Sequence, residues 1–391
     1  MSAQFTKFVM IRKVEKMKKY LALILSALLV VSLLAACGDA SGTPDQPAAP
    51  TPEPGVEAAQ TPEDPERVYR IAAIMNQVGV NPFLTQVVDE LAAIYASGQF
   101  PMEYRVMEFT DVAMAGEHVR AAVEEGFDLI INVGFQAADA MAEVSQMFPD
   151  RATYVNIDIA VDSPYVKSVL FTTSESAYLV GIIAGMVAAD MGAPMGPFGA
   201  VHANPGQGGF HWRYGYMRGV MSVNPDVTLD DFLINFTRSF SDAPLAKELA
   251  LQQAAQGAVF INAASAVADF GTFEAALETG SFFTSGQDAD RTTPDNPYIL
   301  STQLKYTGKA TRMVIEAFFN EGITPGIVRW GIAEGGVGAS NITSPGFYRN
   351  YEVLTDEIVA RAQQAAEDIR AGRIVLYPVP LEEDFTGMVA E

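Results

Sequence analysis

From residue 67 onward, short apolar runs rich in β-branched residues alternate with segments whose apolar residues recur at helical spacing. This alternation predicts βαβ units and a parallel sheet, because a helix that follows one strand returns the chain to a parallel neighbour. The expected strands of this first series are Val68–Met75, Tyr104–Glu108, Asp128–Val133 and Thr153–Asp158. The expected helices between them are Phe83–Ala96, Ala113–Glu125 and Gln136–Phe148.

A second series of the same kind follows. Its expected strands are Phe198–His202, Thr228–Asn235, Ala258–Asn262 and Ser281–Ser285, and its expected helices are one that ends at Met221, Pro244–Gln256 and Phe270–Glu278. Two consecutive α/β series indicate two similar lobes, with a ligand between them at the carboxyl ends of the strands. The apolar helix Ala177–Ala189 has 13 residues. A bilayer span needs about 20, so we expect a buried packing helix there.

The composition excludes several classes of protein. The chain carries 47 Asp and Glu against 25 Lys and Arg, for a formal net charge of −22. This acidity argues against a nucleic-acid partner, because phosphate contacts need clusters of Lys and Arg, and none follows the N-terminal segment. One Cys excludes an internal disulfide and a Cys-based metal site, and three His leave little for a histidine site. We therefore expect no metal and no cofactor.

The single Cys lies at the end of an export signal. Basic residues end at Lys19, and Tyr20–Ala36 carries no charge, which is the layout of a signal peptide over residues 1–36. The run ends in Leu-Ala-Ala-Cys at residues 34–37, which resembles the bacterial lipobox. Lipoprotein processing attaches diacylglycerol to that sulfur and cleaves just before it. Cys37 is therefore the expected lipidation site, the alternative being an ordinary signal peptide with a chance Cys.

Two further expectations concern the N-terminal part of the chain. Met17 opens a signal of ordinary length, so we expect translation to start there. Residues 38–66 hold seven Pro, seven acidic residues and no base. Such a composition cannot build a core, so residues 37–66 are expected to form a lipidated, disordered tether that gives the folded part reach above the membrane.

Catalytic signatures are absent from the sequence. Gly308-Lys309 is followed by Ala310 and does not match the phosphate-loop pattern. The Gly-rich segment at residues 206–211 and the one that starts at Gly336 both fail the dinucleotide-binding fingerprint at its third glycine. Because no nucleophile–base pair and no metal-ligand spacing stands out either, the chain is not expected to be an enzyme.

The sequence does contain residues that are suited to binding a ligand. Gln287–Asp290 follows an expected strand, where carboxylates can accept hydrogen bonds from ligand hydroxyls. The alternative is a solvated loop or a weak cation site. Phe83 follows the first strand, and Trp212 and Tyr214 follow a Gly-rich loop. Aromatic rings at such positions can sandwich a planar ligand, and the alternative is core packing.

Long stretches of the chain resemble one known family. The stretches are Asp128–Ala188, Trp212–Val227, Ser239–Ala264, Gly286–Asp290 and Ser301–Lys305. They are similar to the basic membrane protein family, the PnrA-like substrate-binding lipoproteins of ABC transporters typified by purine-nucleoside receptors. The resemblance implies an α/β, type I periplasmic-binding-protein fold, with two doubly wound parallel-sheet lobes joined by a three-stranded hinge that close around the ligand. The implied lobes are 68–171 with about 302–328, and 172–301 with about 329–391.

The resemblance also implies roles for individual residues. Asp288 matches an acidic residue that holds ribose hydroxyls, and Lys305 matches the lysine that joins it. Trp212 and Phe83 match positions where an aromatic ring stacks on the base. Asp158 matches an acid at the end of the fourth strand, a candidate for base or ribose contacts.

The N-terminal motif departs from the family pattern. Asn76 falls near the leading Asp of a motif that approximates D-x-G-x-x-D-x-S-F-N, and this chain lacks both acids of the motif and the Asn after Phe83. A cleft with a different set of polar groups prefers different ligands. A ligand that leaves a buried polar group unpaired loses about 1–3 kcal/mol of binding free energy.

The expected function is a lipid-anchored, monomeric binding protein that delivers a nucleoside, in the first place a purine nucleoside, to the permease subunits of an ABC importer. Three alternatives stay open at this point. They are a sensory receptor on the same scaffold, a binder of another small solute, and a surface enzyme that acts on nucleosides.

Overall fold

The computed structural model describes residues 67–389. The expected signal peptide, the start at Met17, the lipidation site Cys37 and the tether at 37–66 lie outside the described residues. Within the described part, no helix combines the length and the apolar character needed to cross a membrane.

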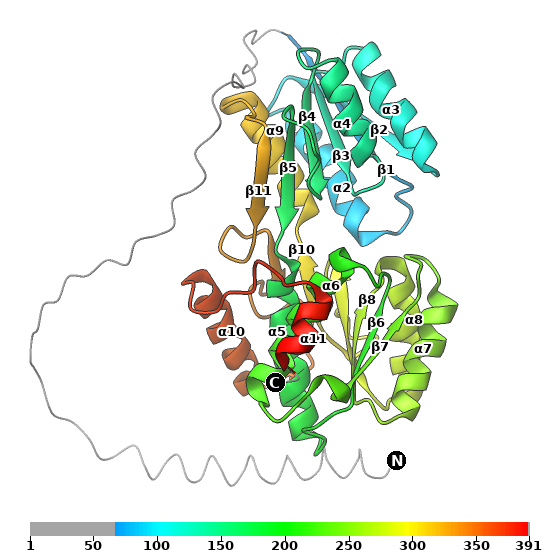
Figure 1. Cartoon of the computed structure of the whole chain (residues 1–391), viewed down its shortest axis with the longest axis vertical. Helices are drawn as coiled ribbons and strands as arrows, with labels where there is room; N and C mark the ends of the chain where they lie inside the picture. Colours follow the sequence, from blue (N-terminus) through cyan, green and yellow to red (C-terminus); the bar gives the residue numbers. More distant parts are fainter. Residues whose placement is uncertain (1–66, 390–391) are drawn as a thin grey trace, which may run out of the picture. The chain divides into compact units, whose positions relative to one another are not determined.

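The described chain up to Phe171, together with residues 307–330, builds one parallel sheet and its helices (Figure 1). Its six strands run in the order β11-β5-β4-β3-β1-β2. Their bounds are β1 Tyr69–Asn76, β2 Met102–Phe109, β3 Leu129–Val133, β4 Thr153–Asp158, β5 Val166–Phe171 and β11 Gly326–Trp330. The helices of this lobe are α2 Pro82–Ser97, α3 Val112–Glu124, α4 Ala138–Met147 and α9 Thr307–Asn320. Its core packs α3 and α4 onto the sheet through Phe109, Val119, Met141 and Tyr154.

The second lobe repeats this plan. Its six strands run in the order β12-β10-β9-β8-β6-β7, and β12 alone is antiparallel to its neighbour. Their bounds are β6 Phe198–His202, β7 Phe232–Phe236, β8 Phe260–Ala264, β9 Phe283–Asp288, β10 Ile299–Lys305 and β12 Val337–Ala339. The helices are α5 Thr173–Asp190, α6 Gln207–Val223, α7 Ala243–Ala255, α8 Asp269–Thr279, α10 Asp356–Arg370 and α11 Glu382–Val389, with 3₁₀ turns η1 Leu229–Asp231 and η2 Ala266–Ala268. The predicted pair of α/β lobes is therefore confirmed.

The chain crosses between the two lobes at three places. These crossings are β5 to α5 at Phe171–Thr173, β10 to α9 at Lys305–Thr307, and β11 to β12 after Trp330. Because β10 pairs with β9 and β12, the chain re-enters the first lobe after Lys305 rather than at about residue 302. All three crossings lie next to strand ends, so the strand ends of both sheets share one region of the molecule.

Local sequence sets several of the element boundaries. The Asn81 side chain accepts a hydrogen bond from the Phe83 amide and caps α2, and Pro82 occupies the first turn. The expected strand Thr228–Asn235 is wrong in its first half, where Thr228 and Asp231 form a reciprocal capping box around a 3₁₀ turn. The capping box supplies hydrogen bonds to backbone N–H groups of this segment, so the strand begins only at Phe232.

The apolar helix expected at Ala177–Ala189 lies within α5. It is buried, as predicted, and the structure shows that it packs against α6. Gly181 and Gly185 face α6, where Gly215 and Gly219 stand on the opposite side. A Cβ atom at Gly181 would overlap the Tyr216 carbonyl oxygen. Glycine at these positions is what lets the two helix backbones approach so closely.

Candidate ligand-binding site

A cavity of about 610 Å³ is lined by residues of both lobes. All six predicted ligand-binding residues line it: Asn76, Phe83, Asp158, Trp212, Asp288 and Lys305. Four of the six close a parallel strand, which explains their convergence, because the carboxyl ends of parallel strands meet at one edge of a sheet. The structure thus brings the predicted residues together, and their contact with a ligand stays a prediction.

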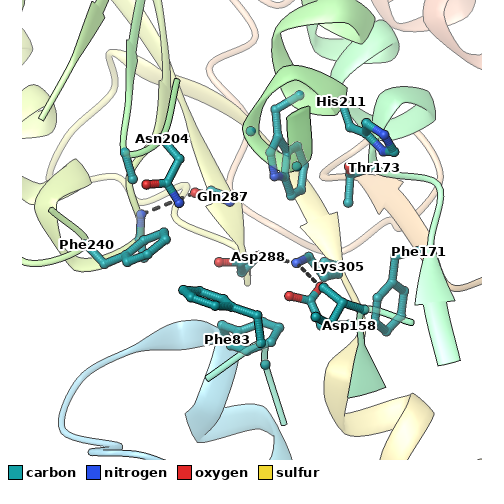
Figure 2. A pocket seen from close by; sticks show the side chains of 18 of the residues that line it. Phe83, Asp158, Phe171, Thr173, Asn204, His211, Phe240, Gln287, Asp288 and Lys305 are labelled. Carbon is teal, nitrogen blue, oxygen red and sulfur yellow. Dashed lines mark hydrogen bonds and ion pairs between the residues drawn. The ribbon is translucent and has the colours of Figure 1, made fainter. Parts of the chain in front are cut away.

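An ammonium between two carboxylates forms the polar centre of the cavity (Figure 2). Lys305 Nζ lies 2.8 Å from Asp158 Oδ1 and 4.0 Å from Asp288 Oδ1. Burial disfavours the charged form of Lys305, but the two carboxylates outweigh it and raise the pKa of the ammonium. Lys305 therefore stays protonated and holds a fixed positive charge inside the cavity.

Asp288 is the more buried of the two carboxylates. Its side chain is 3% exposed, against 23% for Asp158. Burial raises the pKa of Asp288 to about 6, in spite of the opposing charge of Lys305. Its Oδ1 has no hydrogen-bond partner in the described part of the chain, and its backbone has a φ of 67°, a left-handed conformation. A buried acceptor without a donor, held at a strand end beside a cavity, is what a ligand hydroxyl would satisfy.

Aromatic rings surround the Lys305 ammonium. Its Nζ lies 4.6 Å from the ring centre of Phe83, 5.6 Å from that of Trp212 and 5.8 Å from that of Phe171. Cation–π attraction at these distances stabilises the ammonium in the polar centre. Phe83 comes from the first lobe and Trp212 from the second, so rings of both lobes stand close to the same charged atom.

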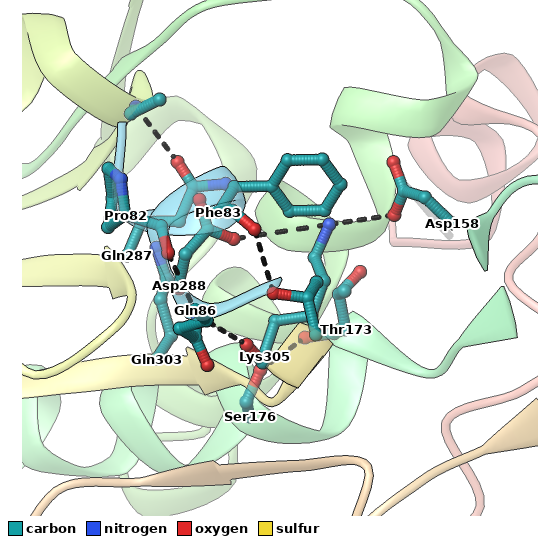
Figure 3. A network of polar contacts seen from close by, with 12 residues as sticks. Pro82, Phe83, Gln86, Asp158, Thr173, Ser176, Gln287, Asp288, Gln303 and Lys305 are labelled. Atoms are coloured by element: carbon teal, nitrogen blue, oxygen red, sulfur yellow. Dashed lines mark hydrogen bonds and ion pairs between the residues drawn. The ribbon is translucent and has the colours of Figure 1, made fainter. Parts of the chain in front are cut away.

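Hydrogen bonds fix Phe83 against the strand that carries Lys305 (Figure 3). Gln86 Nε2 donates to the backbone oxygen of Lys305 at 3.1 Å and to that of Pro82 at 3.0 Å. Thr307 Oγ1 donates to the backbone oxygen of Phe83 at 2.7 Å. The start of α2 is thereby joined to the crossing between β10 and α9, and the Phe83 ring is held beside the ammonium.

Not every residue that the sequence singled out faces the cavity. Asp290 and Tyr214 are not among the lining residues. Asp290 accepts hydrogen bonds from Thr292 and Ser340, which agrees with the alternative of a structural turn. The Tyr214 ring packs edge-on against Phe385 with ring centres 5.1 Å apart, which agrees with core packing.

Several lining residues were missed by sequence reasoning. They include His202, His211, Thr173, Phe240 and Arg329. Burial lowers the pKa of His211 to about 4, helped by the charges of Arg329 and Lys305, so its ring is neutral at neutral pH. His202 closes β6, a strand that had been predicted with these bounds, so its position at a strand end was a signal that could have found it.

Comparison with known proteins identifies the family. A family model described as ABC transporter substrate-binding protein, PnrA-like, matches residues 104–377. This chain belongs to that family. Basic membrane protein B of Borreliella afzelii is 27% identical over 254 residues, which make up 62% of this chain and 72% of that protein. The ABC transporter nucleoside-binding protein BmpA of Lactococcus lactis is 25% identical over 277 residues, 66% of this chain and 73% of that protein.

Solved structures agree with the fold. An ABC transporter solute-binding protein from Aeropyrum pernix has a TM-score of 0.68 at 24% identity, over 82% of this chain and 96% of that one. Another, from Conexibacter woesei, has a TM-score of 0.61 at 18% identity, over 79% of this chain and 98% of that one. The PnrA-like protein described here thus has the two-lobe α/β fold of periplasmic solute-binding proteins, and its cavity between the lobes is the candidate solute site.

Proposed function

We propose that this ABC transporter substrate-binding protein is a lipid-anchored extracytoplasmic receptor that captures a purine nucleoside and delivers it to the permease subunits of an importer. One observation carries the proposal. Aromatic rings from both lobes stand around a lysine that is paired with two carboxylates, all in a single cavity. A nucleoside has the matching parts, a flat apolar base and a sugar with vicinal hydroxyls.

In this proposal the base stacks on Phe83 and Trp212. The sugar hydroxyls donate to the free Oδ1 of Asp288 and accept from Lys305 Nζ. Asp158 keeps Lys305 in place through the 2.8 Å ion pair. Asn76 faces the cavity from the end of β1, and its Oδ1 accepts from the Gln77 amide at 2.7 Å, so its Nδ2 is the group it can offer to a ligand. The name of the nucleoside-binding relative from Lactococcus lactis supports the same class of ligand.

Titration calorimetry with purified protein tests the ligand class. The panel consists of adenosine, guanosine, inosine, uridine, cytidine, the free purine bases and D-ribose. Purine nucleosides should bind, while free base and free ribose each lose one half of the contacts and should bind far more weakly. If no nucleoside binds and another solute class does, the nucleoside proposal is wrong while the family assignment stands.

Membrane attachment is tested separately in cells that process lipoproteins. Cys37→Ser should release the protein from the membrane fraction, because no sulfur would remain to carry the diacylglycerol. Stable anchoring needs more than one acyl chain. Ser41→Ala, four residues further along, is the matched control and should stay in the membrane fraction. Lipid labelling of the Cys37→Ser variant would contradict attachment at that residue. Light scattering on the soluble variant tests the proposed monomeric state.

A further inference from the structure

Arg329 is a cation of the cavity that has no acidic partner among residues 67–389. It lies in β11, lines the cavity, and is half-buried. Its guanidinium stands 4.0 Å from the ring centre of Tyr377, and its Nη1 donates to the Phe171 backbone oxygen at 3.4 Å. Within residues 67–389 it forms no ion pair with any carboxylate. A guanidinium has five donors in one plane, so most of its donor capacity is left for a ligand.

The environment places Arg329 at one end of the cavity. Arg329 lies beside Phe171, whose backbone oxygen accepts from its Nη1, and its charge helps to lower the pKa of His211. Figure 2 shows His211, Thr173 and Phe171 on one side of Lys305, and Asp288, Gln287 and Phe240 on the other. If the sugar is held at Asp288, the base extends toward His211 and Arg329.

The chemistry at the Arg329 end of the cavity limits the class of ligand that can bind there. A guanidinium is a donor only, and its fork matches two adjacent acceptors. A phosphate group fits poorly, because His211 is neutral and Lys305 is already paired with Asp158, which leaves one positive charge for a dianion. An uncharged pair of acceptors is the better match. A 6-oxopurine presents such a pair in O6 and N7, whereas adenine presents N7 beside an amino donor.

Building on the proposed nucleoside function, we propose that Arg329 is a specificity-determining residue that donates to the O6 and N7 edge of a 6-oxopurine, so that the receptor selects guanosine and inosine over adenosine. The Tyr377 ring, 4.0 Å from the guanidinium, and the Phe171 backbone oxygen, which accepts from Nη1, position the guanidinium, and its other N–H groups can donate to a ligand. The neutral His211 ring has one donor and one acceptor, so it tolerates either base and does not contribute to the selection. The discrimination therefore depends on Arg329.

The test compares guanosine, inosine, 7-deazaguanosine and adenosine by calorimetry on the wild type and three variants. Arg329→Met removes the charge and the fork, and Arg329→Lys keeps the charge but not the fork. Arg120→Met is the matched control, since Arg120 pairs with Glu143 on α4, away from the cavity. Thermal melting of the free proteins checks that each variant is folded.

The wild type should prefer guanosine and inosine over adenosine roughly ten- to a hundredfold, which is the discrimination expected of a bidentate pair. Loss of N7 in 7-deazaguanosine should weaken binding. Both Arg329 variants should lose most of the preference, and Arg120→Met should keep it. Equal binding of adenosine by the wild type, or an unchanged preference in Arg329→Met, overturns this inference and leaves the nucleoside proposal intact. If no nucleoside binds, both are wrong.

Discussion

The carboxylate of Asp288 is 3% exposed, and its Oδ1 lacks a hydrogen-bond partner in the described structure. Replacement by Asn removes the buried charge, and Asn tolerates the left-handed backbone at this position better than most residues. Asp288→Asn should therefore stabilise the ligand-free protein by about 1 kcal/mol. The same change should weaken nucleoside binding at least tenfold, since a hydrogen bond to a charged acceptor contributes about 1.5–3 kcal/mol.

Chemical denaturation and calorimetry measure these two effects on the same samples. Asp150→Asn, at an exposed position outside the cavity, is the control and should change neither quantity. Unchanged affinity in Asp288→Asn would remove this residue from the binding site, and a loss of stability would show that the free oxygen is satisfied in solution.

The raised pKa of Asp288 makes binding depend on pH. Burial raises this pKa to about 6, so the carboxylate ionises as the pH increases through that value. Ligand hydroxyls need the ionised acceptor, and affinity should therefore rise between about pH 5 and 7 and level off above. The stability of the free protein should change in the opposite direction. A carboxyl whose folded pKa lies above its unfolded pKa stabilises the fold at low pH, and that contribution is lost as the pH rises through about 6.

Calorimetry and melting across this pH range should show the two opposite trends in the wild type. In Asp288→Asn the trend in affinity should be absent and the trend in stability smaller, since burial also raises the pKa values of Asp269 and Glu175. A wild-type affinity that falls as the pH increases from 5 to 7 would mean that the protonated acid is the form that binds.

Cavity residues at the ends of strands could be predicted from the sequence. Cavity residues in a strand that pairs with a part of the chain far away in sequence could not. Asp158 follows an apolar run, and parallel strands bring such ends together, so a sequence pattern was sufficient. Arg329 lies in β11, which pairs with β5 across more than 150 residues of intervening chain and has two exposed residues at its start. No local pattern marks that strand, so its contribution to the cavity was visible only in the structure.

At the scale of elements, the packing of α5 on α6 leaves no room for a side chain at Gly181. Gly181→Ala would place a Cβ against the Tyr216 backbone oxygen, which belongs to a helix that cannot yield by a side-chain rotation. We expect a loss of roughly 1–3 kcal/mol in the free energy of unfolding, the usual cost of overpacking a core. Chemical denaturation of the variant measures it.

Gly116→Ala in α3 is the matched control for that experiment. Its Cβ would meet only the Ala140 Cβ at 3.5 Å, an ordinary van der Waals distance. Because Ala favours helix over Gly, this control should be neutral or stabilising by up to about 1 kcal/mol. Equal effects of the two substitutions would show that backbone entropy, and not the close approach of α5 and α6, decides the stability.

Some strands with one uniform apolar pattern were predicted with their observed bounds, whereas β5 was not predicted although it is mostly apolar, and β10, which is stabilised by polar partners, was not predicted either. The strand Thr153–Asp158 was predicted with its observed bounds, because it is a short apolar run between turn signals. β10 was missed, although its resemblance to the family was noted, since the buried centre of the strand reads Ser-Thr-Gln. Those side chains are satisfied by distant partners, as in the bond from Ser301 Oγ to the Ser340 backbone oxygen. The local sequence pattern therefore predicts a loop at these polar residues instead of a strand.

At the scale of the whole molecule, the chain crosses between the lobes at three places, so we expect that one lobe can move against the other around the cavity. The site is divided between them, with Phe83 and Asp158 in the first lobe and Trp212 and Asp288 in the second. A ligand that contacts both sets is stabilised only when the lobes approach, so binding should favour a more closed arrangement.

Small-angle X-ray scattering with and without saturating guanosine measures this closure. The radius of gyration of the wild type should decrease on binding, because the lobes draw together while the number of residues is constant. Asp288→Asn, at the same ligand concentration, should remain mostly unbound and show little decrease, and it should contract once the ligand concentration is raised above its weaker dissociation constant. A radius of gyration that stays unchanged at full saturation of the wild type would mean that the described arrangement already binds without closure, and the ligand would then have to reach residues of both lobes at their present separation.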